Sequence, residues 1–321
     1  MSNWAFPTEM QANPDEYDFD LRRALDSVVG LRAGIPADAF TASILGTERS
    51  GNGVVIRDDG LVLTIGYLIT EASEIWLTSS RGSVLPGSAL AYDYASGLGL
   101  VQPLGQLDLP ALERGSSGAC GVGSRVVVAG QGGRAHALKA NVIGKHEFAG
   151  YWEYLLDEAL FTAPAHPQWG GAALLGEDGR LLGVGSLLVE EQRDKGTVEG
   201  NMFVPIDLLE PILDDMLKLG RPGSAPRPWL GFYVTVVEDQ LVIAGLAQGG
   251  PAERAALKVG DRVLEVAGRR VNGLAELFRE IWKQGAAGVE VTLTLLRRGS
   301  TSQIRLRSAD REEFLKKPNL H

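Results

Sequence analysis

The sequence predicts a mainly β protein made of two antiparallel barrels followed by a smaller domain. Short apolar runs recur between Gly, Asp and Ser turns from Ser43 to Val184, where helical periodicity is hard to find. The 41 Gly and 15 Pro suit a fold with many strands and tight turns. Short strands of this kind pack as antiparallel barrels, and 321 residues leave room for two or three domains.

The first element along the chain is an N-terminal arm, residues 1–20. It holds five acids and no bases, together with Pro7 and Pro14, so we predict an extended or mobile arm. Residues 21–31 are expected to begin as a short helix and to continue into the first strand at Ser27–Leu31. Later strands are expected at the apolar runs 53–56, 61–63, 74–77, 125–129 and 181–184.

An amphipathic helix closes the barrel region. From Asp207 to Leu219 the apolar residues share one face: Leu208, Leu209, Ile212, Leu213, Met216 and Leu219. The Gly- and Pro-rich segment after it ends the helix and forms a linker. The expected domains are therefore 21–220, a linker 221–228, a second domain 229–308 and a mixed-charge tail 309–321.

Composition excludes several classes of function. The net charge of −9 argues against a nucleic-acid or anionic membrane surface. No Cys-x-x-Cys or His/Cys cluster has the spacing of a metal site, and Cys120 is alone, so it is expected as a free thiol near a core strand. The glycine-rich segments 118–123 and 130–133 do not fit a phosphate-binding strand-loop-helix unit. We expect no cofactor and no metal.

The N-terminus lacks the basic start and apolar run of a secretory signal. No uninterrupted apolar run reaches the roughly 18 residues of a membrane span. The sequence as written therefore predicts a cytoplasmic protein without a membrane span, or a periplasmic one if a leader has been removed.

Three stretches resemble trypsin-like serine proteases of the HtrA/DegP type. They are Gly51–Ile69, Ala165–Gly171 and the C-terminal third, and the resemblance extends from residue 27 to about 298. It implies a trypsin-like double antiparallel β-barrel followed by a PDZ domain.

The catalytic positions of that family carry other residues here. The family's histidine run, Gly-Tyr-Ile-Leu-Thr-Asn-Asn-His-Val-Val, aligns on 60–69 and places Tyr67 at the histidine. The aspartate pattern places Gly97 at the aspartate, and the nucleophile motif places Gly170 at the serine. A phenol with a pKa of about 10 is a poor base at neutral pH, and glycine has no side chain. The resemblance therefore implies a degenerate triad.

The alternative is a shifted alignment, with the true triad elsewhere. The only candidate bases are His136, His146, His166 and His321, each expected as a surface or capping residue. His166 lies at the edge of the former active site and is the strongest of the four. Serines are plentiful, but none lies in a Gly-x-Ser-Gly-Gly setting.

The C-terminal region resembles a PDZ domain most specifically. Residues 249–268 follow that family's Ser-Pro-Ala-x-x-Ala-Gly-Leu-x-x-Gly-Asp-x-Ile-x-x-Val-Asn-Gly pattern almost residue by residue. A helix at 273–284 and a last strand at 289–297 are expected to complete it. The segment Trp229-Leu230-Gly231-Phe232 corresponds to the Gly-Leu-Gly-Phe ligand loop.

Such a loop binds peptides by a simple physical rule. An exposed sheet edge accepts a peptide as an extra strand, and successive backbone N–H groups capture its terminal carboxylate. We expect the site to comprise Trp229, Leu230, Gly231 and Phe232, with Leu277 and Ile281 from the helix at i, i+4 spacing. Phe232, Leu277 and Ile281 also fit a plain core role, and Arg227 fits either carboxylate binding or a solvated linker.

The sequence thus supports two functions. The favoured one is a catalytically inactive HtrA-like protein that binds peptides or protein C-termini as an adaptor, a chaperone-like holder or a regulator of protein quality control, partnered by an active HtrA-type protease. The alternative is an HtrA-like endopeptidase with a non-standard or partner-completed site. The resemblance also implies a homotrimer, with residues 17–20 of the arm in the packing.

Overall fold

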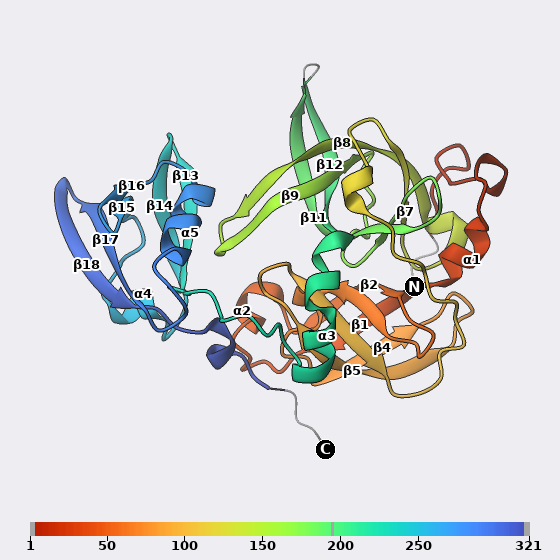
Figure 1. Cartoon of the computed structure of the whole chain (residues 1–321), viewed down its shortest axis with the longest axis horizontal. Coiled ribbons are helices and arrows are strands. Elements are labelled where there is room, and N and C mark those ends of the chain that lie inside the picture. The colour runs from red at the N-terminus through yellow and green to blue at the C-terminus, as the bar shows by residue number, and fades with distance from the viewer. Residues whose placement is uncertain (1–3, 194–195, 318–321) are drawn as a thin grey trace. The chain divides into compact units, whose positions relative to one another are not determined.

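The computed structural model describes residues 4–193 and 196–317, which form two compact units (Figure 1). One unit contains the chain as far as His146, Glu158–Gly223 and the segment from Lys316. The other contains Glu147–Asp157 and Ser224–Leu315. Compared with the expected domain ranges, the main difference is that Glu147–Asp157 groups with the C-terminal region.

The first barrel is a closed antiparallel sheet in the order β1-β2-β3-β6-β5-β4. Its interior is filled by buried Val, Leu and Ile side chains, including Leu31, Leu63 and Leu77. Two short helices, α1 (Leu21–Asp26) and α2 (Ala42–Leu45), flank β1. The strands are β1 (Val28–Gly34), β2 (Glu48–Val55), β3 (Val62–Ile65), β4 (Glu74–Thr78), β5 (Val84–Tyr92) and β6 (Leu98–Pro103).

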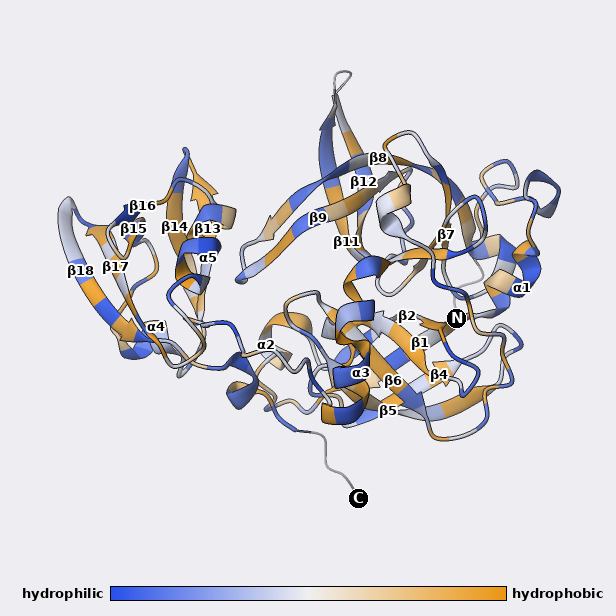
Figure 2. Ribbon diagram, in the orientation of Figure 1, coloured by the Kyte–Doolittle hydropathy of each residue, from blue (hydrophilic) through white to orange (hydrophobic). Residues whose placement is uncertain are grey.

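The second barrel is closed in the order β10-β11-β12-β9-β8-β7. Hydrophobic residues gather on the strands of both barrels, while the turns are mostly hydrophilic (Figure 2). The core of the second barrel includes Cys120, a buried free cysteine as predicted. The strands are β7 (Arg125–Ala129), β8 (Ala137–Gly150), β9 (Tyr154–Ala163), β10 (Ala173–Leu175), β11 (Leu181–Arg193) and β12 (Gly196–Pro205).

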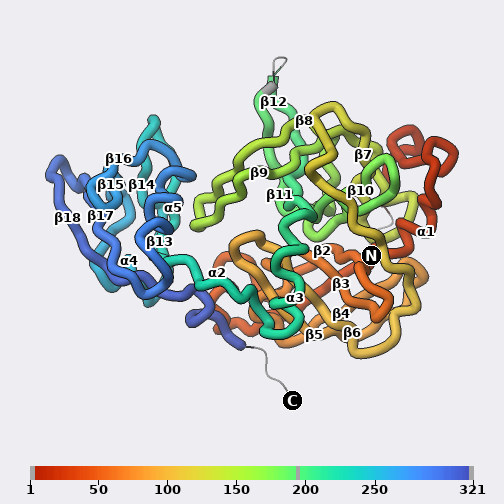
Figure 3. Tube along the Cα trace, in the orientation of Figure 1, coloured from red at the N-terminus to blue at the C-terminus, as the bar shows by residue number. Residues whose placement is uncertain are grey.

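The predicted amphipathic helix is confirmed as α3 (Glu210–Leu219), preceded by the 3₁₀ turn η5 (Ile206–Leu208). It ends where Gly220 takes a left-handed conformation with φ of 73° and donates its N–H to Met216 O. The helix lies against β5 of the first barrel, as the chain trace shows (Figure 3). No helix in the described ranges is long and apolar enough to cross a membrane.

The C-terminal unit contains one sheet in the order β13-β14-β15-β17-β18, with β16 paired to β15. Its core is built around Leu230, Phe232, Leu277, Phe278 and Ile281. Strand β13 lies at the edge of this order. The elements are β13 (Phe232–Val237), β14 (Gln240–Leu246), α4 (Pro251–Arg254), β15 (Arg262–Val266), β16 (Arg269–Arg270), α5 (Leu274–Trp282), β17 (Glu290–Arg297) and β18 (Ser300–Arg307).

The N-terminal arm is bonded to the second barrel over part of its length. Phe6 N donates to Ala135 O at 3.0 Å, and Ala12 N donates to Ala137 O at 2.9 Å. Lys139 N returns a bond to Met10 O at 2.9 Å. The arm is thus anchored by backbone pairing and includes the 3₁₀ turn η1 (Pro14–Glu16), features that its acidic composition does not reveal.

Candidate functional site

Tyr67 lies in the 3₁₀ turn η2 (Gly66–Leu68), directly after β3, at the place predicted for the catalytic histidine. A buried arginine holds this turn: Arg49 Nη1 donates to Tyr67 O at 2.7 Å and to Thr70 O at 3.0 Å. Arg49 Nη2 donates to Thr41 Oγ1 at 2.7 Å. These bonds fix the backbone from which the Tyr67 side chain projects.

The Tyr67 side chain extends from the first barrel and bonds to the second. Its Oη donates to Ser186 O of β11 at 2.9 Å. Burial raises the pKa of Tyr67 above its ordinary value, so the phenol stays protonated at neutral pH. A protonated phenol whose proton is already donated to a carbonyl does not act as a general base.

Gly170 lies against that phenol, just before β10. A β-carbon built on Gly170 would be 2.9 Å from Tyr67 Oη, closer than real β-carbon contacts. Gly170 O accepts hydrogen bonds from Asn52 N at 2.8 Å and from Asn52 Nδ2 at 3.2 Å. The structure therefore brings the predicted histidine and serine positions together, and Tyr67 fills the space a side chain at 170 would need.

Gly97 forms the turn between β5 and β6, beside the same 3₁₀ turn. Its φ of 82° is left-handed, and its carbonyl accepts from Gly66 N at 2.7 Å. The carboxylate of Asp93 upstream is used within this turn, accepting from Ala95 N at 3.1 Å and Ser96 N at 2.8 Å. Gly97 thus lies beside the turn that carries Tyr67, and the phenol of Tyr67 lies against Gly170.

The backbone around Gly170 also differs from a working oxyanion hole. In trypsin-like proteases the donors are the N–H groups of the nucleophile and of the residue two positions earlier. Here that earlier residue is Gln168, whose N–H donates to His166 Nδ1 at 3.0 Å. Because Nδ1 accepts, Nε2 carries the ring proton and donates it to His136 O at 3.0 Å.

The histidines are held in structural settings. His166 is fully buried, and burial lowers its pKa to about 4. Burial also lowers the pKa of His136. His146 Nε2 is 3.3 Å from Glu191 Oε2, and its ring stacks on Phe161 with centroids 4.1 Å apart. His321, the fourth candidate, lies outside the described residues.

The predicted ligand loop in the C-terminal unit binds a carboxylate of the chain itself. Gly231 has a left-handed φ of 75°, which lets three successive N–H groups point to one side. They donate to the carboxylate of Glu153, from Leu230 N at 3.1 Å, Gly231 N at 2.7 Å and Phe232 N at 3.3 Å. Glu153 is only 3% exposed.

Comparison with known proteins identifies the two kinds of domain. Residues 51–184 match the family model of trypsin-like peptidase domains, and residues 228–307 match that of PDZ domains. The chain is similar to DegP-like serine endoproteases. It combines a trypsin-like protease fold with a C-terminal PDZ domain, as the sequence resemblance implied.

Individual relatives give the same picture. A probable periplasmic serine endoprotease DegP-like of Halomonas elongata is 27% identical over 273 residues, which cover 81% of this chain but 56% of the relative. Serine endoprotease DegS of Haemophilus influenzae is 23% identical, covering 81% of this chain and 77% of DegS. The chain thus spans about half the length of the DegP-like relatives it matches.

Solved structures share the fold of this HtrA/DegP-like chain. A serine endoprotease from Yersinia pestis superposes with a TM-score of 0.55 at 18% identity, covering 93% of this chain and 98% of that one. The HtrA-type protease AlgW with tripeptide superposes with a TM-score of 0.53 at 17% identity, covering 92% and 96%. The predicted mainly β architecture is confirmed.

The other residues predicted for the peptide site are mostly core. Leu230, Phe232, Leu277 and Ile281 are at most 1% exposed and belong to one apolar cluster, which also includes Leu155. Trp229 pairs its backbone with Ala309 and is 6% exposed. The Arg227 guanidinium lies 4.2 Å from the ring centroid of Trp282, at the end of α5. Sequence analysis missed Glu153 and Leu155, because neither lies in a recognisable motif.

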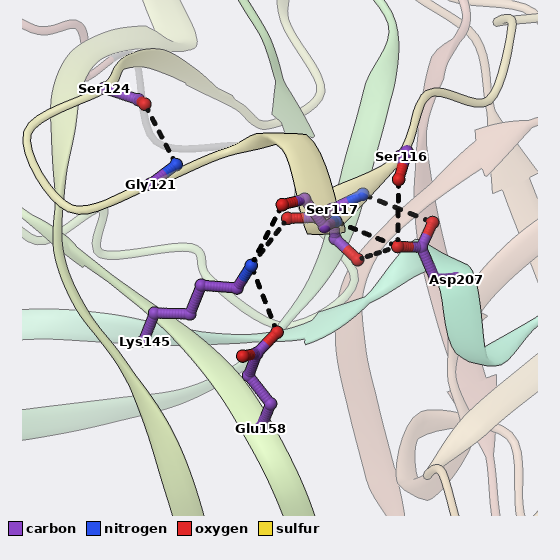
Figure 4. A network of polar contacts seen from close by, with 8 residues as sticks. Ser116, Ser117, Gly121, Ser124, Lys145, Glu158 and Asp207 are labelled. Carbon is purple, nitrogen blue, oxygen red and sulfur yellow. Dashed lines mark hydrogen bonds and ion pairs between the residues drawn. The ribbon is translucent and has the colours of Figure 1, made fainter.

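A second carboxylate cluster, around Asp207, is structural. Asp207 accepts from Ser117 Oγ at 2.8 Å, Ser116 Oγ at 3.2 Å, and the N–H groups of Ser117 and Gly118 at 3.2 and 2.9 Å (Figure 4). Lys145 donates to Ser117 O at 3.1 Å and pairs with Glu158 at 3.1 Å. Burial raises the pKa of Asp207, but these hydrogen bonds outweigh it and lower the pKa overall. These bonds hold the loop before β7 against the turn that follows β12.

Proposed function

We propose that this HtrA/DegP-like protein is catalytically inactive and binds peptides or protein C-termini through its PDZ domain. It would act as an adaptor, a chaperone-like holder or a regulator in protein quality control. The observation that carries the proposal is the pair of sites just described: a protease site filled by Tyr67 at Gly170, and a PDZ loop whose N–H groups hold a carboxylate.

The protease site supports inactivity at each step of the chemistry. The triad residues act as a unit, and loss of its nucleophile or base lowers kcat by about a million-fold in the subtilisin example. Here the nucleophile position has no side chain, and the base position is a protonated phenol bonded to Ser186 O. One oxyanion donor, Gln168 N–H, is bonded to His166. Transition-state stabilisation therefore has neither a reacting group nor a complete set of donors.

The PDZ loop supports peptide binding. Three backbone donors converge on one carboxylate, which is how such loops capture a peptide C-terminus. The AlgW structures that share the fold were solved with a tripeptide and with a decapeptide. By this analogy we propose that a groove opens between β13 and α5, where the buried cluster of Leu230, Phe232, Leu277 and Ile281 accepts an apolar last residue.

The relatives also guide the biological setting. Several are named as probable periplasmic proteins, so we place the periplasm ahead of the cytoplasm, for which these relatives give no support. An active HtrA-type protease is the partner we propose, with a homotrimer as the assembly. The relatives are also named serine endoproteases, and endopeptidase activity at an unassigned site is the competing function.

The binding half of the proposal can be tested with one groove variant. Gly231→Glu puts a bulky acid in the loop at a left-handed position, where even a β-carbon would lie 3.0 Å from the Trp229 ring. Gly249→Glu is the matched control, because Gly249 has a similar φ of 67° and open space around it. We expect free-carboxylate peptides to bind the control but not Gly231→Glu. Equal binding to both variants would place the peptide site elsewhere.

A further inference from the structure

The segment Glu147–Asp157, here called the hairpin tip, joins β8 to β9 and packs within the C-terminal unit. Its central residue, Glu153, has a left-handed φ of 61°, which is uncommon for a residue with a side chain. Its carboxylate is buried on the N–H groups of the ligand loop. The tip therefore occupies the position that a bound carboxylate would take.

A second contact lies along the edge of the sheet. Val234 N of β13 donates to Tyr151 O, two residues before Glu153, at 3.0 Å. The rings of Tyr151 and Tyr233 also meet, with centroids 6.2 Å apart. Backbone pairing with an edge strand is the second element of peptide capture by strand addition.

The third contact is apolar. Leu155, two residues after Glu153, is 6% exposed and lies in the same core cluster as Leu230, Phe232, Leu277 and Ile281. Ala149 packs against this cluster from the other arm of the tip. The tip thus supplies a carboxylate, a strand-edge carbonyl and a buried apolar side chain, the three features by which a C-terminal peptide is recognised.

A charged clamp holds both arms of the tip to α5. Arg279 Nη2 lies 2.5 Å from Glu147 Oε2 and also pairs with Asp157 Oδ1. The two acids are the first and last residues of the tip. Helix α5 contacts β13, so the clamp ties the tip to the helix that packs beside this edge strand.

We infer that the hairpin tip is a built-in ligand of the PDZ groove and that a C-terminal peptide binds only when it displaces the tip. This inference rests on the proposed function, because it concerns the regulation of the same groove. The tip and a peptide compete for the same three N–H donors, so only one of them is bound at a time. The apparent affinity for peptide is the intrinsic affinity reduced by the fraction of molecules with an open groove.

The first test compares Glu153→Gln with the full-length wild type and with Glu158→Gln. Glu158 lies on the same hairpin, 52% exposed, in a surface pair with Lys145, so its replacement is the matched control. The probe is a set of labelled decapeptides with an apolar last residue, each as free acid and as carboxamide. We expect Glu153→Gln to bind the free acids roughly ten-fold more tightly than wild type, since the glutamine amide has an NH2 donor where one of the two accepting oxygens meets the loop N–H groups.

A second variant and a second measurement test the same inference independently. Arg279→Gln removes the clamp but leaves Glu153 in place, and we expect a smaller gain in peptide affinity. Hydrogen exchange reports occupancy directly. In ligand-free wild type the amides of residues 230–232 should be protected, and in Glu153→Gln they should exchange faster. Peptide binding to wild type should speed exchange in the tip while the loop stays protected.

The outcomes separate the inference from the proposed function. Equal peptide affinity for wild type and Glu153→Gln, with no change of exchange in the tip on binding, would overturn the built-in ligand. If instead the loop amides of Glu153→Gln exchange freely and no free-acid peptide binds, the groove is open and unused. That result would refute the proposed peptide binding while leaving the occupancy by Glu153 intact.

Discussion

The phenol of Tyr67 lies against Gly170, where a β-carbon would come within 2.9 Å of Tyr67 Oη. The hydrogen bond from Tyr67 Oη to Ser186 O, 2.9 Å long, holds the ring in this place. The two residues therefore fit each other: the bulky side chain at the position predicted for the histidine leaves room only for glycine at the position predicted for the serine.

This fit predicts a coupling in stability. Gly170→Ala should lower the free energy of unfolding by about 1–3 kcal/mol, because the added methyl overpacks against Tyr67. Tyr67→Phe should cost about 1 kcal/mol through its lost hydrogen bond. The double variant should be less destabilised than the sum, because the phenylalanine has no Oη for the methyl to meet. Chemical denaturation of the wild type, the two single variants and the double variant measures this coupling.

Gly121→Ala is the control for that cycle. Nothing lies within 4 Å of a β-carbon at Gly121, so its replacement should change the free energy of unfolding by little and add independently to Tyr67→Phe. If the stability changes of Gly170→Ala and Tyr67→Phe add as simply as those of Gly121→Ala and Tyr67→Phe, the close contact between position 170 and Tyr67 Oη is relieved in solution.

The hairpin tip should make peptide binding depend on pH. Burial raises the pKa of the Glu153 carboxyl to about 7 from 4.5, against the opposing effects of the loop N–H groups and Arg311. Because the docked carboxyl holds its proton more tightly, docking is favoured below 4.5 and loses that contribution as pH rises to about 7. Peptide affinity of the wild type should therefore rise from pH 5 to 7 and level off above it.

The peptide affinity should change by at most about ten-fold per pH unit in this range, because one carboxyl titrates. The charged or titratable groups that interact with Glu153 are Arg311 and Tyr233. Burial raises the pKa of Tyr233 above 10, so it does not titrate in this window. Binding isotherms of one free-acid peptide at pH 5, 6, 7 and 8 suffice, with Glu153→Gln expected to give a flat profile. A matching slope in that variant would assign the titration to another group.

His166 should limit stability in acid. Burial lowers its pKa to about 4 from 6.5, so the unfolded chain binds the proton more tightly. The contribution of neutral His166 is present above 6.5 and is lost as pH falls towards 4, by up to about 3 kcal/mol. Unfolding free energies across this range should fall less steeply for His166→Gln than for the wild type. An equally steep fall in both proteins would assign the loss of stability in acid to another group.

The PDZ domain should depend on one ion pair with a buried acid. Asp261 is 1% exposed and accepts two bonds of 2.6 Å from Arg297, as well as one of 2.8 Å from Lys258 N. Asp261→Ala would remove the acceptor of these three bonds, at a cost of about 1–3 kcal/mol to the C-terminal unit. Thermal unfolding should show this loss, whereas replacing the exposed Glu290 with Ala should change little. Similar transitions in both variants would rule out a structural role for the pair.

Much of the fold was predictable because it depends on local signals. Turn residues between short apolar runs indicated the barrels, and the helix from Glu210 to Leu219 carried a clear apolar face. Of the residues placed at the three catalytic positions, Gly170 lies against Tyr67, and Gly97 bonds to Gly66 beside it, because the flanking motifs fix their place in the barrels. Leu230 and Gly231 were predicted on the ligand loop for the same reason.

What the sequence did not reveal depends on contacts between distant segments. Glu153 lies 78 positions before Gly231 and in no motif, so nothing local marks it as the partner of the loop. Leu277 and Ile281 fit the groove and the core equally well by periodicity, and only packing with Leu155 shows how the tip meets them. The hydrogen bond from Gln168 N–H to His166 likewise could not be predicted from the sequence, because it depends on three-dimensional geometry.

The measurement that tests the central claim most directly is hydrolysis of unfolded casein by the purified full-length chain, beside an active HtrA-type protease as positive control. We predict no cleavage above buffer, since Tyr67, Gly97 and Gly170 supply neither base nor nucleophile. Cleavage that persists through repurification would contradict this account, and its persistence in Tyr67→Ala would place the catalytic site elsewhere in the chain.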